Sequence, residues 1–235
     1  MQYQLFGGAA ADDLKFHRTF VFHNQRVLTG AFVCAEILSE KPFSIAFSHG
    51  WVPVGPVLRV TAADGAVLRE LNGMPAWDAY LEFAADQGLP APAVGAEAPF
   101  LMRHILGMLV PGGHKLRVPL FKNADGSLGC AAEVPEGALV QIMQSNDLAI
   151  LAGGESAVRR AAGADGPPLA GALVVECVAT RLHLGERFFD QVGTTARSVD
   201  PAHMIGCASF GQLARVDAEF SGLMDATSLV CLIPS

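Results

Sequence analysis

The sequence predicts an α+β protein with mixed or antiparallel β-sheets, flanking helices and two subdomains. Three observations support this prediction. Strand-like apolar runs outnumber helix-like ones, the helices are interspersed without strict alternation, and short turn signals join several strands. A doubly wound parallel sheet requires regular alternation of strand and helix, so this pattern argues against it.

Residues 1–87 form the first predicted region, made of strands and hairpins closed by one helix. Residues 18–38 predict two strands joined by a polar turn at 23–26. Residues 43–71 repeat the pattern around Ala63-Asp64-Gly65, and Asp-Gly is a strong hairpin signal. A helix then follows Pro75, with an apolar face, and ends before Gly88.

Residues 88–99 are rich in Pro, Ala and Gly, and we expect them to be a linker to a second region, 100–235. This region opens with a short helix or strand over 100–109. Ser145 or Asn146 can cap its first long helix, with Asp147 in the first turn. The expected strands are 115–121, 128–134, 139–144, 172–179, 203–213 and 227–233, and the expected helices are 145–164 and 184–200.

Composition excludes several classes of function. The formal net charge is −7 and no Lys/Arg cluster occurs, so we expect no binding to nucleic acid or to an anionic membrane. There is no 18-residue apolar stretch and no signal-peptide pattern at the N-terminus. The five cysteines include no C-x-x-C pair, which favours buried reduced thiols and a cytoplasmic location.

Motifs for catalysis are weak, and we expect no enzyme. The run "GGAAADD" lacks the Lys of a phosphate-binding loop, and its Asp12-Asp13 pair fits a solvated turn better than a cation site. The run "CASFG" resembles a nucleophile elbow only superficially. A hydrolase that uses Cys207 or Ser209 would need a histidine base, and the sequence places none beside either residue.

The seven histidines show no helical i, i+4 pair, which argues against a zinc site. A single histidine can hold a haem, so spacing leaves that use open. His49 precedes Gly50-Trp51 beside a strand, and His104 follows Arg103 in an apolar run. Both are candidate haem ligands, although a structural histidine is the simpler interpretation of each.

Two charged residues stand in apolar runs. Arg103 in "FLMRHIL" requires a partner, either a core carboxylate or an anionic ligand. Glu176 in "ALVVECVA" lies on an open sheet face, pairs with Arg103 or Arg181, or lines a cavity.

The closing passage, 209–227, is rich in glycine and hydroxyl groups. Ser209, Gln212, Asp225 and Thr227 can provide the polar contacts of a mostly apolar ligand pocket. The alternative is a tight, hydroxyl-rich turn between two core strands.

Six motifs in order resemble the FIST family. "FGGAAADDLKFHRTFVFHNQRV", "HGWVPVGPVLRVT" and "ELNGMPAWDAYLEF" are similar to the end of the FIST N region. "VPEGALVQIMQSND", "GALVVECVATRLHLGER" and "MIGCASFGQLARVDAEFSGLMDATSLVCL" are similar to the FIST C region. By this resemblance 1–87 is the last part of the N region and 100–235 is the C region. The chain then starts inside the N region, and the open sheet edge this leaves favours a homodimer.

The resemblance implies an intracellular sensory domain that signals to a separate partner, such as a kinase or a cyclic-nucleotide enzyme. The ligand it implies is an amino acid-like metabolite, or a haem that senses nitric oxide. The alternative is a ligand-free interaction or scaffold domain. We predict that the ligand contacts Arg103, Glu176, Ser209, Gln212, Asp225, Thr227 and, from the HGW motif, Trp51.

Three positions depart from the family pattern. Gln212 stands where the family usually has Glu, Asp225 stands where it has Asn, and Arg181 comes one place later than the Arg of its Cys-x-x-Arg motif. The first change removes a charge and the second adds one, so we expect a pocket of altered polarity.

Overall fold

A computed structural model shows an α+β architecture, as the sequence predicts. It describes residues 3–145, 147–164, 168–216 and 221–235. The strands are β1 (Leu5–Gly8), β2 (Val21–His23), β3 (Arg26–Leu28), β4 (Ser44–Ser48), β5 (Val52–Pro53), β6 (Leu58–Asp64), β7 (Val67–Leu71), β8 (Met74–Pro75), β9 (His104–Val110), β10 (Gly113–Arg117), β11 (Pro119–Lys122), β12 (Leu128–Cys130), β13 (Leu139–Gln144), β14 (Leu169–Cys177), β15 (His203–Ser209), β16 (Gln212–Arg215), β17 (Ser221–Met224) and β18 (Ser228–Pro234). The helices are α1 (Ala76–Asp86), α2 (Glu97–Arg103), α3 (Asp147–Leu151), α4 (Gly153–Ala162), α5 (Val178–Leu184) and α6 (Phe188–Val199), with a 3₁₀ turn at Gly185–Arg187.

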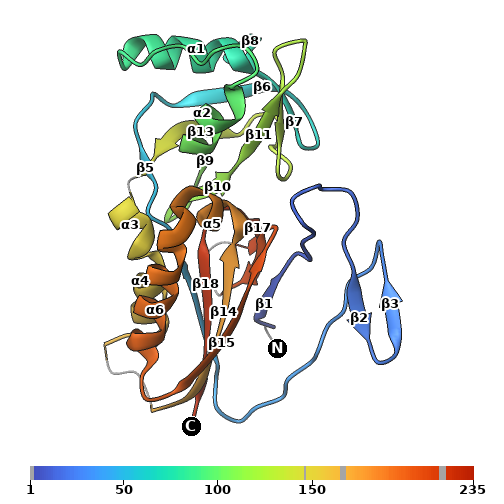
Figure 1. The fold of residues 1–235 in the computed structure, drawn as a ribbon, viewed down its shortest axis with the longest axis vertical. Coiled ribbons are helices and arrows are strands. Elements are labelled where there is room, and N and C mark those ends of the chain that lie inside the picture. The colour runs from blue at the N-terminus through green and yellow to red at the C-terminus, as the bar shows by residue number, and fades with distance from the viewer. Residues whose placement is uncertain (1–2, 146, 165–167, 217–220) are drawn as a thin grey trace.

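The lower half of the molecule in Figure 1 consists of three layers. A four-stranded sheet of order β15-β14-β18-β4 lies in the middle. Helices α4 and α6 cover one of its faces, where Val158, Val174 and Val230 are buried together. A three-stranded sheet, β1-β16-β17, covers the other face. Met224 of this sheet is buried there together with Val175 and Leu229 of the middle sheet.

A nine-stranded antiparallel sheet forms the upper half. Its main order is β10-β9-β13-β6-β7-β12-β11, and helix α1 packs on it through Trp77, Tyr80 and Phe83. Strands β14 and β15 are parallel, whereas every other ladder among the described residues is antiparallel. The rejection of a doubly wound parallel sheet is therefore confirmed.

Both large sheets combine strands from before and after residues 88–99. Strand β4 pairs with β18, and β6 pairs with β13. Residues 88–99 therefore connect two parts of the chain that contribute strands to the same sheets. The division into regions 1–87, 88–99 and 100–235 stays a prediction about the sequence.

The local predictions were mostly confirmed. The β6–β7 hairpin turns at Gly65, whose φ of +57° lies in the left-handed region that glycine adopts freely. The β2–β3 hairpin forms around Asn24. Residues 31–38, expected as part of a strand, have no ladder partner in the part of the chain that the structure describes.

Three predictions of single elements were wrong. Residues 100–109 are not one helix or strand, because α2 ends at Arg103 and β9 begins at His104. Helix α5 begins at Val178, inside the predicted strand 172–179, and the predicted strand 203–213 is divided into β15 and β16. Strand β17 lies within 209–227, where a turn was the alternative to a pocket. Asn146, a predicted alternative helix cap, lies outside the described residues. No helix in the described part of the chain is both long and apolar enough to cross a membrane.

Candidate functional site

Five of the seven predicted ligand contacts gather around the end of β14 and the start of β18. Each of these side chains is at most 5% exposed: Glu176, Ser209, Gln212, Asp225 and Thr227. The middle sheet divides them into separate groups, because successive residues of a strand point to opposite faces. Glu176 faces helix α6, whereas Gln212, Asp225 and Thr227 lie on the side of the three-stranded sheet.

Gln212 connects three strand ends. With its amide oriented to satisfy every neighbour, the nitrogen donates to Thr227 Oγ1 at 2.9 Å and to the carbonyl of Met224 at 3.1 Å. The oxygen accepts from Ser209 Oγ at 3.1 Å and from the N–H of Cys177 at 2.9 Å. All the hydrogen-bonding capacity of this amide is used within the chain, so the group stabilises the fold and leaves no donor or acceptor for a ligand.

Glu176 forms a second group, on the helical side of the sheet. Its carboxyl oxygen accepts from Ser228 Oγ at 2.9 Å, and the amide of Gln191 lies 3.4 Å away. Burial raises the pKa of Glu176 to about 8, although the two side-chain contacts act against the increase. Glu176 is therefore mostly protonated at neutral pH.

The predicted partners of Glu176 were wrong. Arg103 and Arg181 are both exposed to solvent, Arg103 at the last residue of α2 and Arg181 on α5. Neutral groups therefore solvate the carboxyl. In the described structure, no hydrogen bond or ion pair joins Arg103 to another predicted ligand contact.

The buried cation is Arg117, which the sequence analysis did not select. It ends β10 and is 2% exposed. Its Nε donates to the carbonyl of Glu133 at 2.8 Å, and its Nη1 donates to those of Leu116 and Leu223 at 2.9 and 3.1 Å. The signal was present in the sequence, since Arg117 stands between Leu116 and Val118 in a predicted strand.

Asp225 is the charged partner of Arg117. Its Oδ2 lies 3.8 Å from Arg117 Nη1 and accepts from the N–H of Val118 at 3.3 Å. Its Oδ1 is buried and has no hydrogen-bond partner among the described residues. Burial raises the pKa of Asp225 to about 6, although Arg117 acts against the increase. Burial also lowers the pKa of Arg117, against the pull of Asp225.

Lys115 extends this charged group, which we call the Asp225–Arg117 cluster, toward β17. Its Nζ lies over Gly222, 3.2 Å from the point where a Cβ would be. Burial and the nearby Arg117 lower the pKa of Lys115, whereas Asp225 and Glu133 raise it. The cations of Arg117 and Lys115 and the buried carboxylate of Asp225 thus meet at the junction between β10 and β17, with the Glu133 carboxylate nearby.

The candidate haem ligands are in filled surroundings. The ring of His104 packs against those of Phe100 and Phe83, with centroids 4.3 and 5.4 Å away. Its Nδ1 lies 2.9 Å from the carbonyl of Phe100, and its buried Nε2 has no partner among the described residues. These rings leave no space for a porphyrin at Nε2, so the described arrangement does not fit a haem there.

His49 and Trp51 lie in a different part of the core. The N–H of Trp51 donates to His49 Nδ1 at 3.3 Å, and the Trp51 ring contacts His183 edge-on at 5.5 Å. Burial is the main cause that lowers the pKa of His49 to about 4, which keeps it neutral. Trp51 packs with Ile105 and Met143. Within the described residues, no hydrogen bond or ring contact joins it to another predicted ligand residue. Haem binding through His49 stays a prediction.

The two candidate nucleophiles have different surroundings. Ser209 Oγ lies 2.9 Å from the carbonyl of Gly211 and contacts Gln212, whereas Cys207 is exposed on β15. No described hydrogen bond joins either residue to a histidine. In the described part of the chain, no three His, Cys, Asp or Glu side chains are grouped so as to hold a metal ion.

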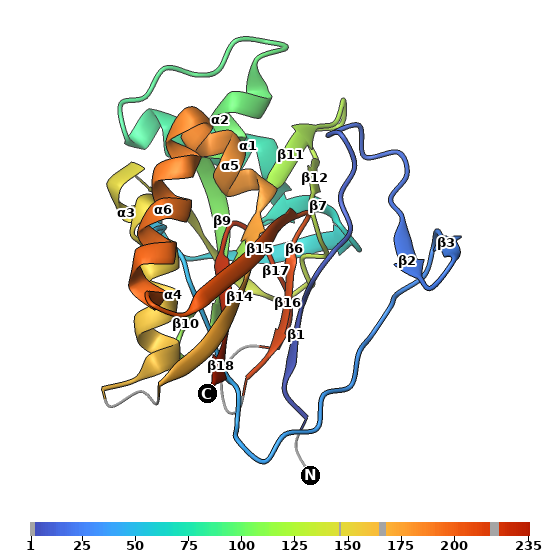
Figure 2. The same ribbon diagram turned by 60° about the horizontal axis from the view of Figure 1, so that its bottom comes forward.

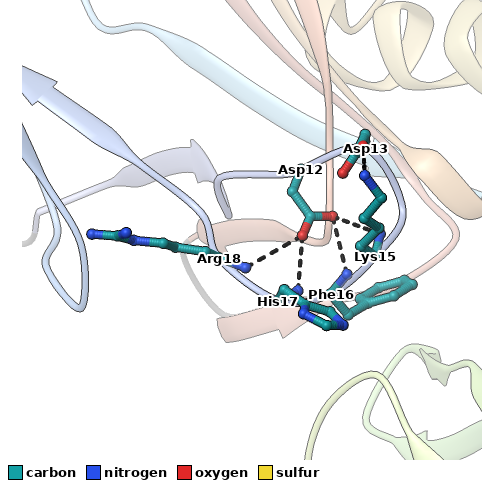
Figure 3. Close-up of polar contacts among 6 residues, drawn as sticks. All are labelled: Asp12, Asp13, Lys15, Phe16, His17 and Arg18. Carbon is teal, nitrogen blue, oxygen red and sulfur yellow. Dashed lines mark hydrogen bonds and ion pairs between the residues drawn. The ribbon is translucent and has the colours of Figure 1, made fainter.

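The glycine-rich N-terminal motif has a structural use. A Cβ on Gly8 would lie 2.8 Å from Val175 Cγ1, so glycine allows β1 to approach the middle sheet. Figure 3 shows the Asp12 carboxylate, which accepts from the backbone N–H groups of residues 15–18 at 2.9–3.4 Å. Partial desolvation works against these bonds, but together they lower the pKa of Asp12. The predicted solvated turn is thus a closed loop, and Asp13 pairs with Lys15.

Two cavities of the described structure lie away from these groups. One of about 70 Å³ is lined by residues of α1, β6, β7 and β13, including Leu58, Phe83 and Ile142. Another, of about 10 Å³, lies between β4, α4 and β18. Ligand pockets usually measure roughly 300–1,000 Å³. The passage predicted to form a pocket is therefore a filled, hydrogen-bonded junction in this structure.

Comparisons with known proteins agree with the motifs in the sequence. Residues 1–74 match the FIST N domain and residues 74–215 match the FIST C domain. An uncharacterized protein of Methanocaldococcus jannaschii is 27% identical over 150 residues, which cover 60% of this chain. The match spans 29% of that relative's length. No solved structure matches the chain.

Proposed function

Since the chain belongs to the FIST family, whose domains are sensory and signalling domains, we propose that it binds an amino acid-like metabolite at the Asp225–Arg117 cluster. The ligand would change the contact between β10 and β17, and a partner protein would read that change. A kinase or a cyclic-nucleotide enzyme acting in trans is the class of partner that suits such a domain.

The observation that carries this proposal is Asp225 Oδ1, which is buried and has no hydrogen-bond partner among the described residues. A buried carboxylate oxygen without a donor is costly, and proteins retain such groups mainly where they have a use. The ion pair beside it is long, at 3.8 Å. A ligand ammonium group could therefore bind Asp225 Oδ1 without displacing any hydrogen bond that the structure gives that atom.

The Asp225–Arg117 cluster also offers positive charge for the carboxylate of such a ligand. An amino acid carries an ammonium and a carboxylate a few ångströms apart, and the cluster holds one carboxylate beside the cations of Arg117 and Lys115. Guanidinium groups bind carboxylates well. Because the cluster is filled in this structure, binding would require β17 to move away from β10.

Native mass spectrometry of the purified protein, with an absorption spectrum, tests the class of ligand. A small bound mass without colour supports a metabolite as the ligand. A bound mass equal to that of haem, with a Soret band, would show that the ligand is a haem and not a metabolite. Thermal shift with the twenty amino acids and their simple derivatives then identifies the ligand.

Variants connect a ligand to the cluster. Asp225→Asn keeps the shape of the side chain and should abolish the ligand-induced thermal shift, while the exposed control Asp190→Asn keeps it. A ligand that stabilises Asp225→Asn as much as the wild type would place the site elsewhere. If neither a bound mass nor a thermal shift is found, the proposal fails.

We further propose a cytoplasmic protein without enzymatic activity. The location is supported by five free thiols, three of them buried. The lack of activity is supported by the neighbours of Ser209, a carbonyl and an amide, which cannot serve as a general base. Hydrolysis of a panel of nitrophenyl esters that was lost in Ser209→Ala or Cys207→Ala would contradict this proposal.

A second candidate function is a ligand-free interaction domain. It is favoured by the filled junction at residues 209–227 together with a large exposed apolar segment, residues 14–38, because such segments usually mark contact surfaces. It predicts that no small molecule shifts the melting temperature of the protein.

A further inference from the structure

Residues 14–38, which we call the arm, leave the body of the protein between β1 and β4. Figures 1 and 2 both show the β2–β3 hairpin at the side of the molecule, away from the sheets. The large apolar side chains of the arm face solvent. Phe32 is 86% exposed and Leu38 82%, and Phe22, Val27 and Ile37 are exposed as well. So much apolar surface on one segment is unusual for a monomer and indicates a binding partner.

The end of the arm is a segment that pairs with no strand among the described residues. Residues 31–38, "AFVCAEIL", have no assigned helix or strand pairing in the described structure. The run is rich in apolar residues and contains neither proline nor glycine, which suits a β-strand. It therefore lacks only a sheet edge with which to pair.

The same chain has such an edge in β15. This seven-residue strand is the outer strand of the middle sheet and pairs on one side with β14. Ile205 is 70% exposed, and Cys207 is exposed too. Its sequence, "HMIGCAS", contains no Lys, Asp, Glu or Pro, the residues that usually protect an open edge from pairing.

Charge indicates which partner supplies the strand. The arm carries Lys15, Arg18 and Arg26 and one acidic residue, Glu36, which leaves 13 basic and 22 acidic side chains on the rest of the chain. A basic, apolar arm thus complements the acidic body of another copy of the same protein. The fixed end of the arm is also close to the edge, since Phe16 stacks on Phe210, directly after β15, with centroids 4.6 Å apart.

We infer that residues 31–38 of one copy add as a strand to β15 of a second copy, and that the exchange is reciprocal. Residues 17–20 and 29–31 flank the β2–β3 hairpin and can together span about 25 Å when extended, enough to reach an adjoining molecule. Strand addition supplies main-chain hydrogen bonds, and reciprocal exchange closes a two-fold dimer. This inference goes beyond the proposed ligand and does not depend on it.

The test uses the two exposed cysteines, Cys34 in the arm and Cys207 on the edge. Equal amounts of unlabelled and ¹⁵N-labelled protein are mixed, allowed to exchange and oxidised mildly with diamide. We expect a Cys34–Cys207 disulfide between a labelled and an unlabelled peptide, and a dimer mass by light scattering before oxidation. Cys34→Ser and Cys207→Ser should each remove the cross-link.

Substitutions then test the surface. Ile205→Lys and Phe32→Glu should each convert the dimer to a monomer, and both sites are so exposed that the fold should survive, as circular dichroism will show. Val94→Lys, at a 99% exposed apolar position outside the arm, is the control and should leave a dimer. Three results would overturn the inference: a monomer at 100 μM, a dimer that persists in both variants, or a cross-link confined to single chains. A monomer that binds anionic vesicles would assign the arm to a lipid surface instead.

Discussion

Glu176 and Asp225, the two buried carboxylates in the described part of the chain, lie on opposite sides of the middle sheet and differ in the groups that compensate their charge. Glu176 contacts a hydroxyl and an amide, and burial raises its pKa to about 8. Asp225 faces Arg117, and its pKa is raised only to about 6. Burial alone therefore does not determine the charge of a core carboxylate, since a nearby cation can keep it ionised at neutral pH.

This difference between the two carboxylates predicts that removing the Arg117 cation has the largest effect on the free energy of unfolding. Arg117→Met should leave Asp225 buried and unpaired and lower the free energy of unfolding by about 3–5 kcal/mol at pH 7. Urea denaturation would measure it. Arg103→Met, at an exposed arginine, should stay within about 0.5 kcal/mol of the wild type. Equal losses in the two variants would show that Arg117 does not compensate Asp225.

The second prediction concerns the dependence of stability on pH. Because the pKa of Glu176 is raised on folding from 4.5 to about 8, the folded state binds more protons in that window. The contribution of Glu176 to the stability of the folded state is fully present below pH 4.5 and is lost as the pH rises through 8. Glu176→Gln should therefore be more stable than the wild type above pH 8 by a few kcal/mol.

Denaturation curves from pH 5 to 9 would measure this difference. The exposed control Glu186→Gln should follow the wild-type curve throughout. If Glu176→Gln showed the same fall in stability with pH as the wild type, Glu176 would be ionised and the comparison between the two carboxylates would not hold.

The smallest effect is expected for the hydroxyl beside Glu176. Ser228→Ala removes the donor at 2.9 Å and should lower the free energy of unfolding by about 1 kcal/mol. Because that hydroxyl lowers the pKa of Glu176, its loss should also raise this pKa further. Carboxyl carbon NMR titration would detect the change, with Ser198→Ala as the control. An unchanged titration would mean that Ser228 does not donate to Glu176.

The sequence by itself determined the α+β class and most of the local elements. The β6–β7 hairpin and helix α1 follow from Asp-Gly, Pro75 and Gly88, which act over a few residues. Element type was uncertain where one apolar run supplied both a helix and a strand, as in 100–109, because an apolar run has no period that separates the two. The motifs also identified the family correctly.

Only the tertiary structure decided the site. The sequence indicated that Ser209, Gln212, Asp225 and Thr227 are unusual for a core. It did not show that Gln212 bonds Ser209 and Thr227, that Asp225 faces Arg117, or that this group and Glu176 lie on different sides of the sheet. It selected Arg103 and missed Arg117, although both lie in apolar runs. The physical reason is that a charge is compensated by atoms that are distant in sequence, here 108 positions away, and only the packed sheets bring those atoms together.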